Sequence, residues 1–217
     1  MTRRPGKIVC VGRNYARHAA ELGHDVPGEP LIFLKPPSSV VSGGEPVLMP
    51  EDVGRVDYEG EIGLVVGRRC RRVPESAAWD HLRGVVAVND MTARDLQRRD
   101  SQWTRAKGLD TFCPVGNVVE AAAVDPADLS VTTRVDGEVR QYGTTAEMVF
   151  SIPRLVSFIS HVMTLEEGDL IATGTPDGVG PVSPGETVEV SLSCGSSVRS
   201  RIERGAPIGV STHVRAG

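Results

Sequence analysis

The chain has 217 residues, of which 40% are hydrophobic and 24% charged, and its net charge is −4. This length and composition predict one soluble globular domain, and the slight acidity offers no basic surface for nucleic acid. No apolar run approaches the roughly 18–20 residues that a membrane-spanning helix needs, so we expect no membrane partner.

The four cysteines are scattered along the chain, and none forms a CxxC pair. This spacing favours neither a zinc site nor a disulfide framework. The N-terminal sequence MTRRPGKIVCVG is basic, but its apolar segment is too short for a secretory signal peptide. We therefore expect the protein in the reducing cytoplasm.

Short strands should dominate the fold, because 24 glycines and 15 prolines favour turns over long helices. Apolar segments bounded by turn residues predict strands at 7–12, 31–35, 47–50, 56–66, 84–90, 113–124 and 169–174. Hairpins are expected at 129–145, with Asp136-Gly137 as the turn, and at 186–203. Helical spacing predicts helices at 13–23, from Ser76 onward, at 91–100 and at 153–163.

These elements contain no internal repeat and no linker, so they predict a single mainly β domain with a few helices over residues 1–205. Residues 206–217 have no strong pattern, which is typical of a disordered tail.

The stretch VDYEGEIGLVV at 56–66 places acids at Asp57, Glu59 and Glu61 within an otherwise apolar strand. Because successive strand residues point to opposite faces, the three acids share one face. They could form a solvated face or protect an edge strand by charge. Alternatively, they could hold a hard cation.

Asp90 follows a buried-type strand, 90 − 61 = 29 residues after Glu61. Two carboxylates on one strand and a third at the end of another would form an all-oxygen site of the kind that Mg²⁺ prefers. The absence of His and Cys from these motifs argues against zinc. The competing interpretation makes Asp90 the N-cap of the helix expected at 91–100.

Three further features could carry chemistry. His18 and Glu21 share a helix face, so the carboxylate could orient the imidazole as a general base, or the two could form an ordinary surface pair. Lys107 could stabilise an anionic substrate or be solvated. The glycine-rich segment TGTPDGVG at 173–180 could turn its N–H groups to an anion or form a simple hairpin turn, and it lacks the GK[ST] ending of a P-loop.

Six segments in this order resemble the fumarylacetoacetate hydrolase family: VGRNYARHAAELG, FLKPPSS, VDYEGEIGLVVG, VNDMTARDLQ, WTRAKGLDTFCPVG and TGTPDGVGPV. They extend from about residue 7 to about residue 205. The resemblance is closest to the short single-domain members, which include acylpyruvate hydrolases, oxaloacetate decarboxylases and 2-hydroxyhepta-2,4-diene-1,7-dioate isomerases.

The resemblance implies a mixed β-sandwich or roll and a homodimer. It implies that Mg²⁺ or Mn²⁺ is held by Glu59, Glu61 and Asp90, with Asp57 supporting the site or solvated. It implies a catalytic role for His18, Glu21 and Lys107. It implies substrate contacts for Arg13, Tyr15, Gln97, Gly174 and Thr175.

From this set we expect a metal-dependent hydrolase that cleaves the C3–C4 bond of acylpyruvates through a metal-stabilised pyruvate enolate, with oxaloacetate decarboxylation as a related activity. The alternatives are an isomerase or decarboxylase of unsaturated 2-hydroxy or 2-oxo diacids in aromatic catabolism, and a non-catalytic metal- or ligand-binding protein. The sequence does not identify the chemical group that the substrate carries beyond C4. A second carboxylate could be met by Arg17, Arg98, Arg99 or Arg105, or these could be solvated helix faces.

Overall fold

The computed structural model describes residues 4–21, 23 and 25–209. Its first sheet contains β1 (Ile8–Gly12), β2 (Leu31–Lys35), β3 (Val40–Ser42), β6 (Gly60–Val66), β7 (Leu82–Asn89), β9 (Cys113–Val115), β10 (Val119–Glu120) and β13 (Leu170–Ala172). The order in this sheet is β2-β1-β13-β6-β7-β9-β3, with β10 paired to β7. Every residue of β6 is buried, as its continuous apolar run predicts.

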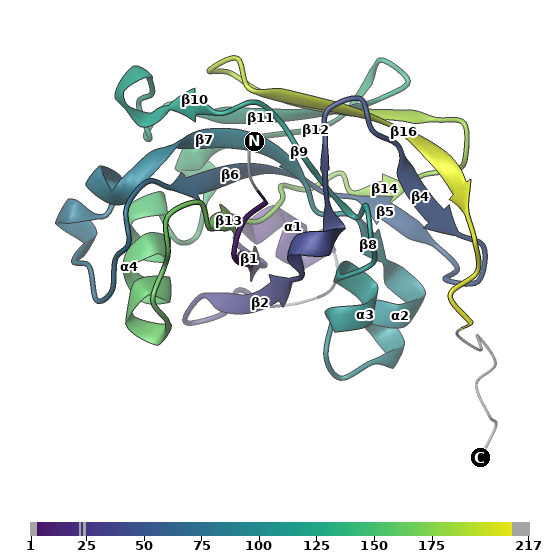
Figure 1. Cartoon of the computed structure of the whole chain (residues 1–217), viewed down its shortest axis with the longest axis horizontal. Coiled ribbons are helices and arrows are strands. Elements are labelled where there is room, and N and C mark those ends of the chain that lie inside the picture. Colours follow the sequence, from purple (N-terminus) through teal and green to yellow (C-terminus); the bar gives the residue numbers. More distant parts are fainter. Residues whose placement is uncertain (1–3, 22, 24, 210–217) are drawn as a thin grey trace.

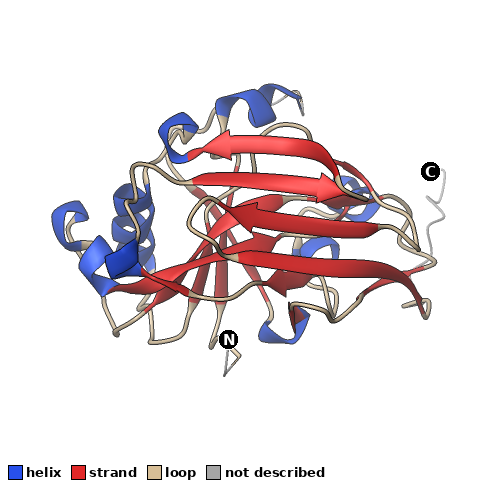
Figure 2. Cartoon of the chain, turned by 90° about the horizontal axis from the view of Figure 1, so that it is seen from above, coloured by secondary structure: helices blue, strands red, loops and turns tan. Residues whose placement is uncertain are grey.

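The second sheet contains β4 (Val47–Pro50), β11 (Ser130–Val135), β12 (Glu138–Thr144), β15 (Thr187–Leu192) and β16 (Ser197–Gly205). Its order is β12-β11-β15-β16-β4, and Figure 2 shows its long strands side by side on one face of the molecule. Buried residues alternate along β11 and β15, so only one face of this sheet meets the core. Asp136 and Gly137 both have positive φ, as the expected hairpin turn requires.

A small third sheet joins β5 (Val56–Tyr58), β8 (Thr92–Ala93) and β14 (Gly180–Pro181) in the order β14-β5-β8. The α-helices of the described residues are α1 (Ala16–Glu21), α2 (Arg94–Arg99), α3 (Thr104–Lys107) and α4 (Ile152–Val162). Figure 1 shows α4 at one end of the molecule and α2 with α3 toward the other. Among these elements no helix is long and apolar enough to cross a membrane.

The main core lies between the first two sheets and against α4. It combines Ile62 and Leu64 of β6 with Val131 of β11, Val190 of β15 and Leu155 of α4. A second cluster covers the opposite face of the first sheet. The arrangement is a mainly β fold of curled, layered sheets with four α-helices in the described part of the chain, which confirms the expected fold class.

Five local expectations were wrong. The strand expected at 113–124 divides into β9 and β10, and Ala121–Ala123 form a 3₁₀ turn. The segment from Ser76 forms two 3₁₀ turns, η2 (Glu75–Ala77) and η3 (Trp79–His81), in place of a helix. The helix expected at 13–23 begins only at Ala16, because Arg13 has a φ of 57° that no α-helix accepts. The strand expected at 56–66 divides at Glu59 into β5 and β6. The helix expected at 91–100 begins at Arg94, so its N-cap is Ala93 and not Asp90.

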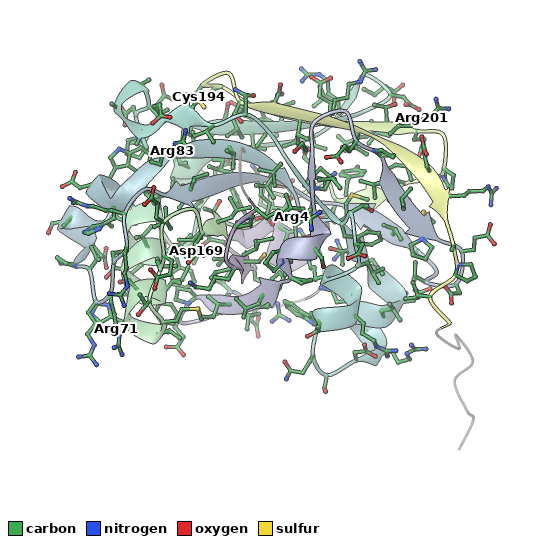
Figure 3. All side chains as sticks on the ribbon, in the orientation of Figure 1. Arg4, Arg71, Arg83, Asp169, Cys194 and Arg201 are labelled. Atoms are coloured by element: carbon green, nitrogen blue, oxygen red, sulfur yellow. The ribbon has the colours of Figure 1, made fainter. Side chains whose placement is uncertain are left out.

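Asp169 fixes the start of the chain against the first sheet. It lies beside the beginning of β1 (Figure 3), and its Oδ1 accepts a hydrogen bond of 3.0 Å from the backbone N–H of Lys7. The Lys7 ammonium also pairs with this carboxylate. These contacts hold β1 parallel to β13, with Ile8 opposite Leu170. At the other end, residues 206–209 follow β16, and the rest of the expected tail lies outside the described residues.

Candidate active site

Three carboxylates meet where the two central strands of the first sheet leave it. Glu59 precedes β6, Glu61 lies within β6, and Asp90 follows β7; one oxygen of each lies within 4.8 Å of the others. The antiparallel register pairs Gly60 with Asn89, and the Asp90 N–H donates to the Glu59 carbonyl at 2.8 Å. All three side chains are at most 5% exposed, so neither a solvated face nor a protected edge strand describes them.

Two buried lysines balance this charge. The Lys107 Nζ lies 2.6 Å from Glu59 Oε2 and 2.6 Å from Asp90 Oδ2. The Lys35 Nζ lies 2.6 Å from Asp90 Oδ1 and also donates to the Met91 carbonyl at 3.3 Å. Lys35 was not among the site residues expected from the sequence, although it is a charged residue that ends the apolar strand LIFLK.

Asp57 supports the site through Arg94. The Asp57 carboxylate accepts from Arg94 Nε at 2.8 Å and from Arg55 Nε at 2.6 Å. The Arg94 Nη2 then lies 2.7 Å from Glu59 Oε1, while Arg94 Nη1 donates to Gln97 Oε1 at 2.8 Å. Asp57 is therefore the supporting acid, not a solvated one. Gln97, expected near the substrate, both orients Arg94 and lines the cavity.

The two glutamates have opposite electrostatic environments. Burial would raise the pKa of Glu59, but Lys107 and Arg94 lower it to about 2. Burial, followed by the charges of Asp90 and Glu59, raises the pKa of Glu61 well above its usual range. The partner that Glu61 does have is the Gly174 N–H, which donates at 2.8 Å. Gly174 has a φ of 101°, which explains the glycine.

This donor set fits a hard divalent cation. It consists of carboxylate oxygens alone, and the raised pKa of Glu61 marks negative charge that the neighbouring cations leave uncompensated. A cation held by Glu59, Glu61 and Asp90 would remove that repulsion. No His or Cys belongs to the cluster found among the described residues.

His18 lies on α1 with its side chain 6% exposed, and its Nδ1 is 3.4 Å from Glu21 Oε2. Glu21 is held in turn by the Gly178 N–H, which lies 3.2 Å from Oε1. Burial lowers the pKa of His18, more than the nearby acids raise it, so the imidazole is neutral at pH 7. The expected His18–Glu21 contact is therefore present and joins α1 to the glycine-rich segment.

A cavity of about 370 Å³ connects these groups. Its walls include the three carboxylates and the other predicted site residues His18, Lys107, Arg13, Gln97 and Thr175. The predicted site residues Glu21, Tyr15 and Gly174 are not among those that line it. Tyr15 is 2% exposed and its hydroxyl has no partner among the residues described.

Asn14 and Gln141 secure segments next to the cavity, and neither was among the site residues expected from the sequence. The Asn14 amide donates to the Thr173 carbonyl at 2.8 Å, which fixes the chain before α1 to the end of β13. Gln141 Nε2 donates to Thr175 Oγ1 at 2.8 Å, and Thr175 donates to the Gly60 carbonyl at 2.9 Å. Their partners lie 159 and 34 residues away, so no local pattern marked them.

A buried carboxylate triad, ion-paired lysines and a His–Glu pair within layered β-sheets define a class of enzymes, and the comparison with known families agrees. Residues 7–206 match the model of the fumarylacetoacetate (FAA) hydrolase C-terminal family. The chain belongs to this family, whose members are enzymes.

Relatives within the family carry different activities in their names. The chain is 49% identical over 203 residues to oxaloacetate tautomerase FAHD1, mitochondrial, of Arabidopsis thaliana, covering 91% of each. It is 43% identical to the solved 5-carboxymethyl-2-hydroxymuconate delta-isomerase from Mycobacterium smegmatis, with a TM-score of 0.86 over 93% of this chain and 80% of that one. It is 33% identical to fumarylpyruvate hydrolase from Pseudomonas aeruginosa in complex with Mn²⁺ and pyruvate, with a TM-score of 0.86 over 92% and 90%.

Proposed function

We propose that the protein is a Mg²⁺- or Mn²⁺-dependent enzyme of 2-oxo acids that hydrolyses the C3–C4 bond of acylpyruvates. The observation that carries this proposal is the single cavity lined by the carboxylate triad, Lys107 and His18. Glu59, Glu61 and Asp90 would hold the cation, which would supply Lewis-acid polarisation of the 2-oxo group. The solved fumarylpyruvate hydrolase, which contains Mn²⁺ and pyruvate, supports both the metal and the substrate class.

His18 serves as the general base in this reaction. Its neutral imidazole removes a proton from water, and the resulting hydroxide attacks the C4 carbonyl carbon. Glu21 orients the ring and stabilises the imidazolium that forms, and the Gly178 N–H holds Glu21 in place. Such a base contributes about 10²–10⁴-fold to the rate.

Lys107 stabilises the charge that leaves. When the C3–C4 bond breaks, its electron pair moves to C3 of the pyruvate fragment and is shared with the 2-oxo oxygen. C3 then takes up the proton that His18 removed from water, which completes pyruvate and frees the carboxylic acid. Burial lowers the pKa of Lys107, but Asp90 and Glu59 raise it more, so the ammonium remains charged in the cavity wall. A fixed buried cation beside a developing negative charge is an effective form of transition-state stabilisation.

Tautomerisation of oxaloacetate is the second candidate, supported by the identity with the oxaloacetate tautomerases. The enol loses its hydroxyl proton and gains a proton at C3, so the same residues can act with no attacking water. Isomerisation of an unsaturated 2-hydroxy diacid requires the same proton movement, and the solved isomerase from Mycobacterium smegmatis supports it.

The remaining expectations complete the proposal. We propose a single catalytic unit over residues 1–205, which the family match over 7–206 supports, and a homodimeric assembly. We also propose a cytoplasmic location, which the three buried, unpaired cysteines Cys10, Cys70 and Cys113 support.

The decisive experiment compares acetylpyruvate with enol-oxaloacetate in Mg²⁺ buffer, with and without EDTA. We expect chelator-sensitive pyruvate release from acetylpyruvate and about a 10²–10⁴-fold loss of it in His18→Ala. His161→Ala is the matched control, because His161 is exposed on α4 and its Nδ1 contacts only the Ser157 carbonyl at 2.9 Å in the described structure.

Calorimetric titration of Mg²⁺ separates the base from the metal site, since His18→Ala should keep the wild-type affinity. Full hydrolysis by this variant would remove His18 from the water-activating role. Decay of enol-oxaloacetate without any pyruvate from acetylpyruvate would replace hydrolysis by tautomerisation.

A further inference from the structure

The cavity has a buried inner end and an open outer end. The carboxylate triad, Arg94 and Lys107 form the inner end and are all at most 5% exposed. The outer end is lined by half-buried or exposed residues, namely Gly12, Arg13, Phe33, Gln97, Arg98 and Trp103. A substrate whose 2-oxo acid group reaches the triad must therefore extend its other end toward this outer group.

Arg13 differs from the other cations that line the cavity. Arg94 and Lys107 are paired with the buried acids, and Arg98 is paired with Asp95. Within the described part of the chain, Arg13 has no hydrogen-bond or ion-pair partner. Its guanidinium therefore brings an uncompensated positive charge to the outer end of the cavity.

The backbone holds Arg13 in place there. Its φ of 57° lies in the left-handed region, which is sparsely populated by residues other than glycine. The preceding residue, Gly12, passes so close to Trp103 that a Cβ would lie 3.3 Å from the indole ring. Asn14, the next residue, is anchored to Thr173 and Phe150. An arginine kept at a strained position between two fixed neighbours points to a recognition role.

The balance of charge at the site also supports a recognition role for Arg13. The network contains four buried carboxylates, Asp57, Glu59, Glu61 and Asp90, three buried cationic side chains, Lys35, Arg94 and Lys107, and the exposed Arg55, so its formal sum is zero. A divalent cation adds two positive charges, and Arg13 adds another. Of these three positive charges, a substrate with one carboxylate leaves two unmatched, whereas a dianion leaves one.

From these observations we infer that Arg13 recognises a second carboxylate at the far end of the substrate, so that the preferred substrates are dicarboxylic 2-oxo acids. This inference rests on the proposed function, because it places the 2-oxo acid group at the triad. A guanidinium binds a carboxylate through two parallel hydrogen bonds, which an aliphatic or acyl end group cannot replace.

A binding experiment tests the inference without any turnover. Calorimetry in Mg²⁺ buffer compares 2-oxoglutarate with 2-oxopentanoate, which share a five-carbon chain and differ by a terminal carboxylate or methyl group. We expect the wild type to bind 2-oxoglutarate about tenfold to a hundredfold more tightly, the size of one charge-assisted interaction. Arg13→Asn, which tolerates the left-handed backbone, should remove this preference and leave 2-oxopentanoate binding within about twofold.

Two further variants sharpen the result. Arg13→Lys keeps the charge but loses the bidentate geometry, so it should retain only part of the preference. Arg105→Gln removes a positive charge of the exposed pair with Asp100, which does not line the cavity, and should leave the preference unchanged.

The same variants then act on acetylpyruvate and fumarylpyruvate, which carry one and two carboxylates. We expect Arg13→Asn to lower kcat/KM for fumarylpyruvate alone, by about tenfold or more. An unchanged 2-oxoglutarate preference in Arg13→Asn, or no preference in the wild type, would overturn the inference. Absence of turnover with an intact Arg13-dependent preference would instead overturn the proposed reaction.

Discussion

At the scale of single residues, the site is defined by buried charges whose neighbours decide their protonation. Glu59 and Glu61 are two residues apart, yet the pKa of the first is lowered and that of the second raised. The difference arises because Glu59 faces Lys107 and Arg94, whereas Glu61 faces Asp90 and Glu59. The pair thus combines one acid that is always ionised with one whose ionisation a cation would favour.

Removing the metal should make stability depend on Glu61. In EDTA, the folded protein keeps a proton on Glu61 at pH values where the unfolded chain has lost it. Stability therefore falls as pH rises from 4.5 toward the raised pKa, by about 1.4 kcal/mol per unit. Glu59 affects stability over a different pH range. Its contribution to stability is present above pH 4.5 and is lost only as the pH falls toward 2.

Urea unfolding of wild type and Glu61→Gln between pH 5 and 9 in EDTA measures this effect. We expect the variant to lack the Glu61-dependent decline and to bind Mg²⁺ at least about tenfold more weakly, since one anionic ligand becomes neutral. Glu120→Gln, at an exposed acid paired with Arg83, should match the wild type in both measurements. Parallel stability profiles for wild type and Glu61→Gln would refute the assignment of charge repulsion to Glu61.

How far the sequence predicted this site depended on sequence separation. The triad, Lys107 and His18 belong to short motifs, and the structure brings them to one cavity, with Glu21 in contact with His18. Lys35 was missed because its carboxylate partner lies 55 residues away. The sequence also allowed Asp90 to be read as a helix N-cap. The chain after Asp90 forms β8 before the helix begins, and nothing in the local sequence shows that β8 pairs with β5.

At the scale of elements, strands and hairpins followed their patterns more closely than short helices did. Alternation and the Asp136-Gly137 turn defined β11 and β12 correctly. The segment after Pro74 has helix-forming residues, but it is only a few residues long before β7 begins at Leu82. Such short segments do not nucleate an α-helix alone, so tertiary contacts selected 3₁₀ turns.

Gly60 is the element-scale feature on which the triad depends, because it separates Glu59 from Glu61. A Cβ at this position would lie 1.9 Å from Thr133 Oγ1 of β11 in the second sheet. We expect Gly60→Ala to lower the free energy of unfolding by about 1–3 kcal/mol and to weaken Mg²⁺ binding. Urea denaturation and calorimetry measure the two effects.

Two additional variants test the cause. Gly43→Ala is the control, since no atom lies within 4 Å of its added Cβ, and it should not destabilise the protein. Thr133→Ala removes the clashing oxygen, so the Gly60→Ala/Thr133→Ala double variant should recover part of the loss. Equal destabilisation with and without Thr133 would show that the close approach is not responsible.

At the scale of the whole molecule, the site is shared by the sheets and does not belong to one of them. The triad comes from the first sheet and its ends, while Gln141 of β12 reaches it from the second sheet. Gln141 Oε1 accepts from the Gly60 N–H at 2.9 Å, and Nε2 donates to Thr175 Oγ1 and the Pro176 carbonyl. This 1% exposed side chain therefore couples the packing of the sheets to the position of the ligands.

The Gln141→Leu variant should show how much the contacts of Gln141 contribute to stability and to metal binding. Leucine keeps a similar volume but leaves the buried Gly60 N–H and the Pro176 carbonyl without their partner, which costs about 1–3 kcal/mol for each group. We expect lower stability in urea and weaker Mg²⁺ binding together, because Gly60 lies between two ligands. Gln102→Leu, at an exposed position between α2 and α3, should change neither quantity. If Gln141→Leu lowered stability while Mg²⁺ affinity stayed at the wild-type value, the second sheet would support the fold alone, and the first sheet by itself would position the carboxylates.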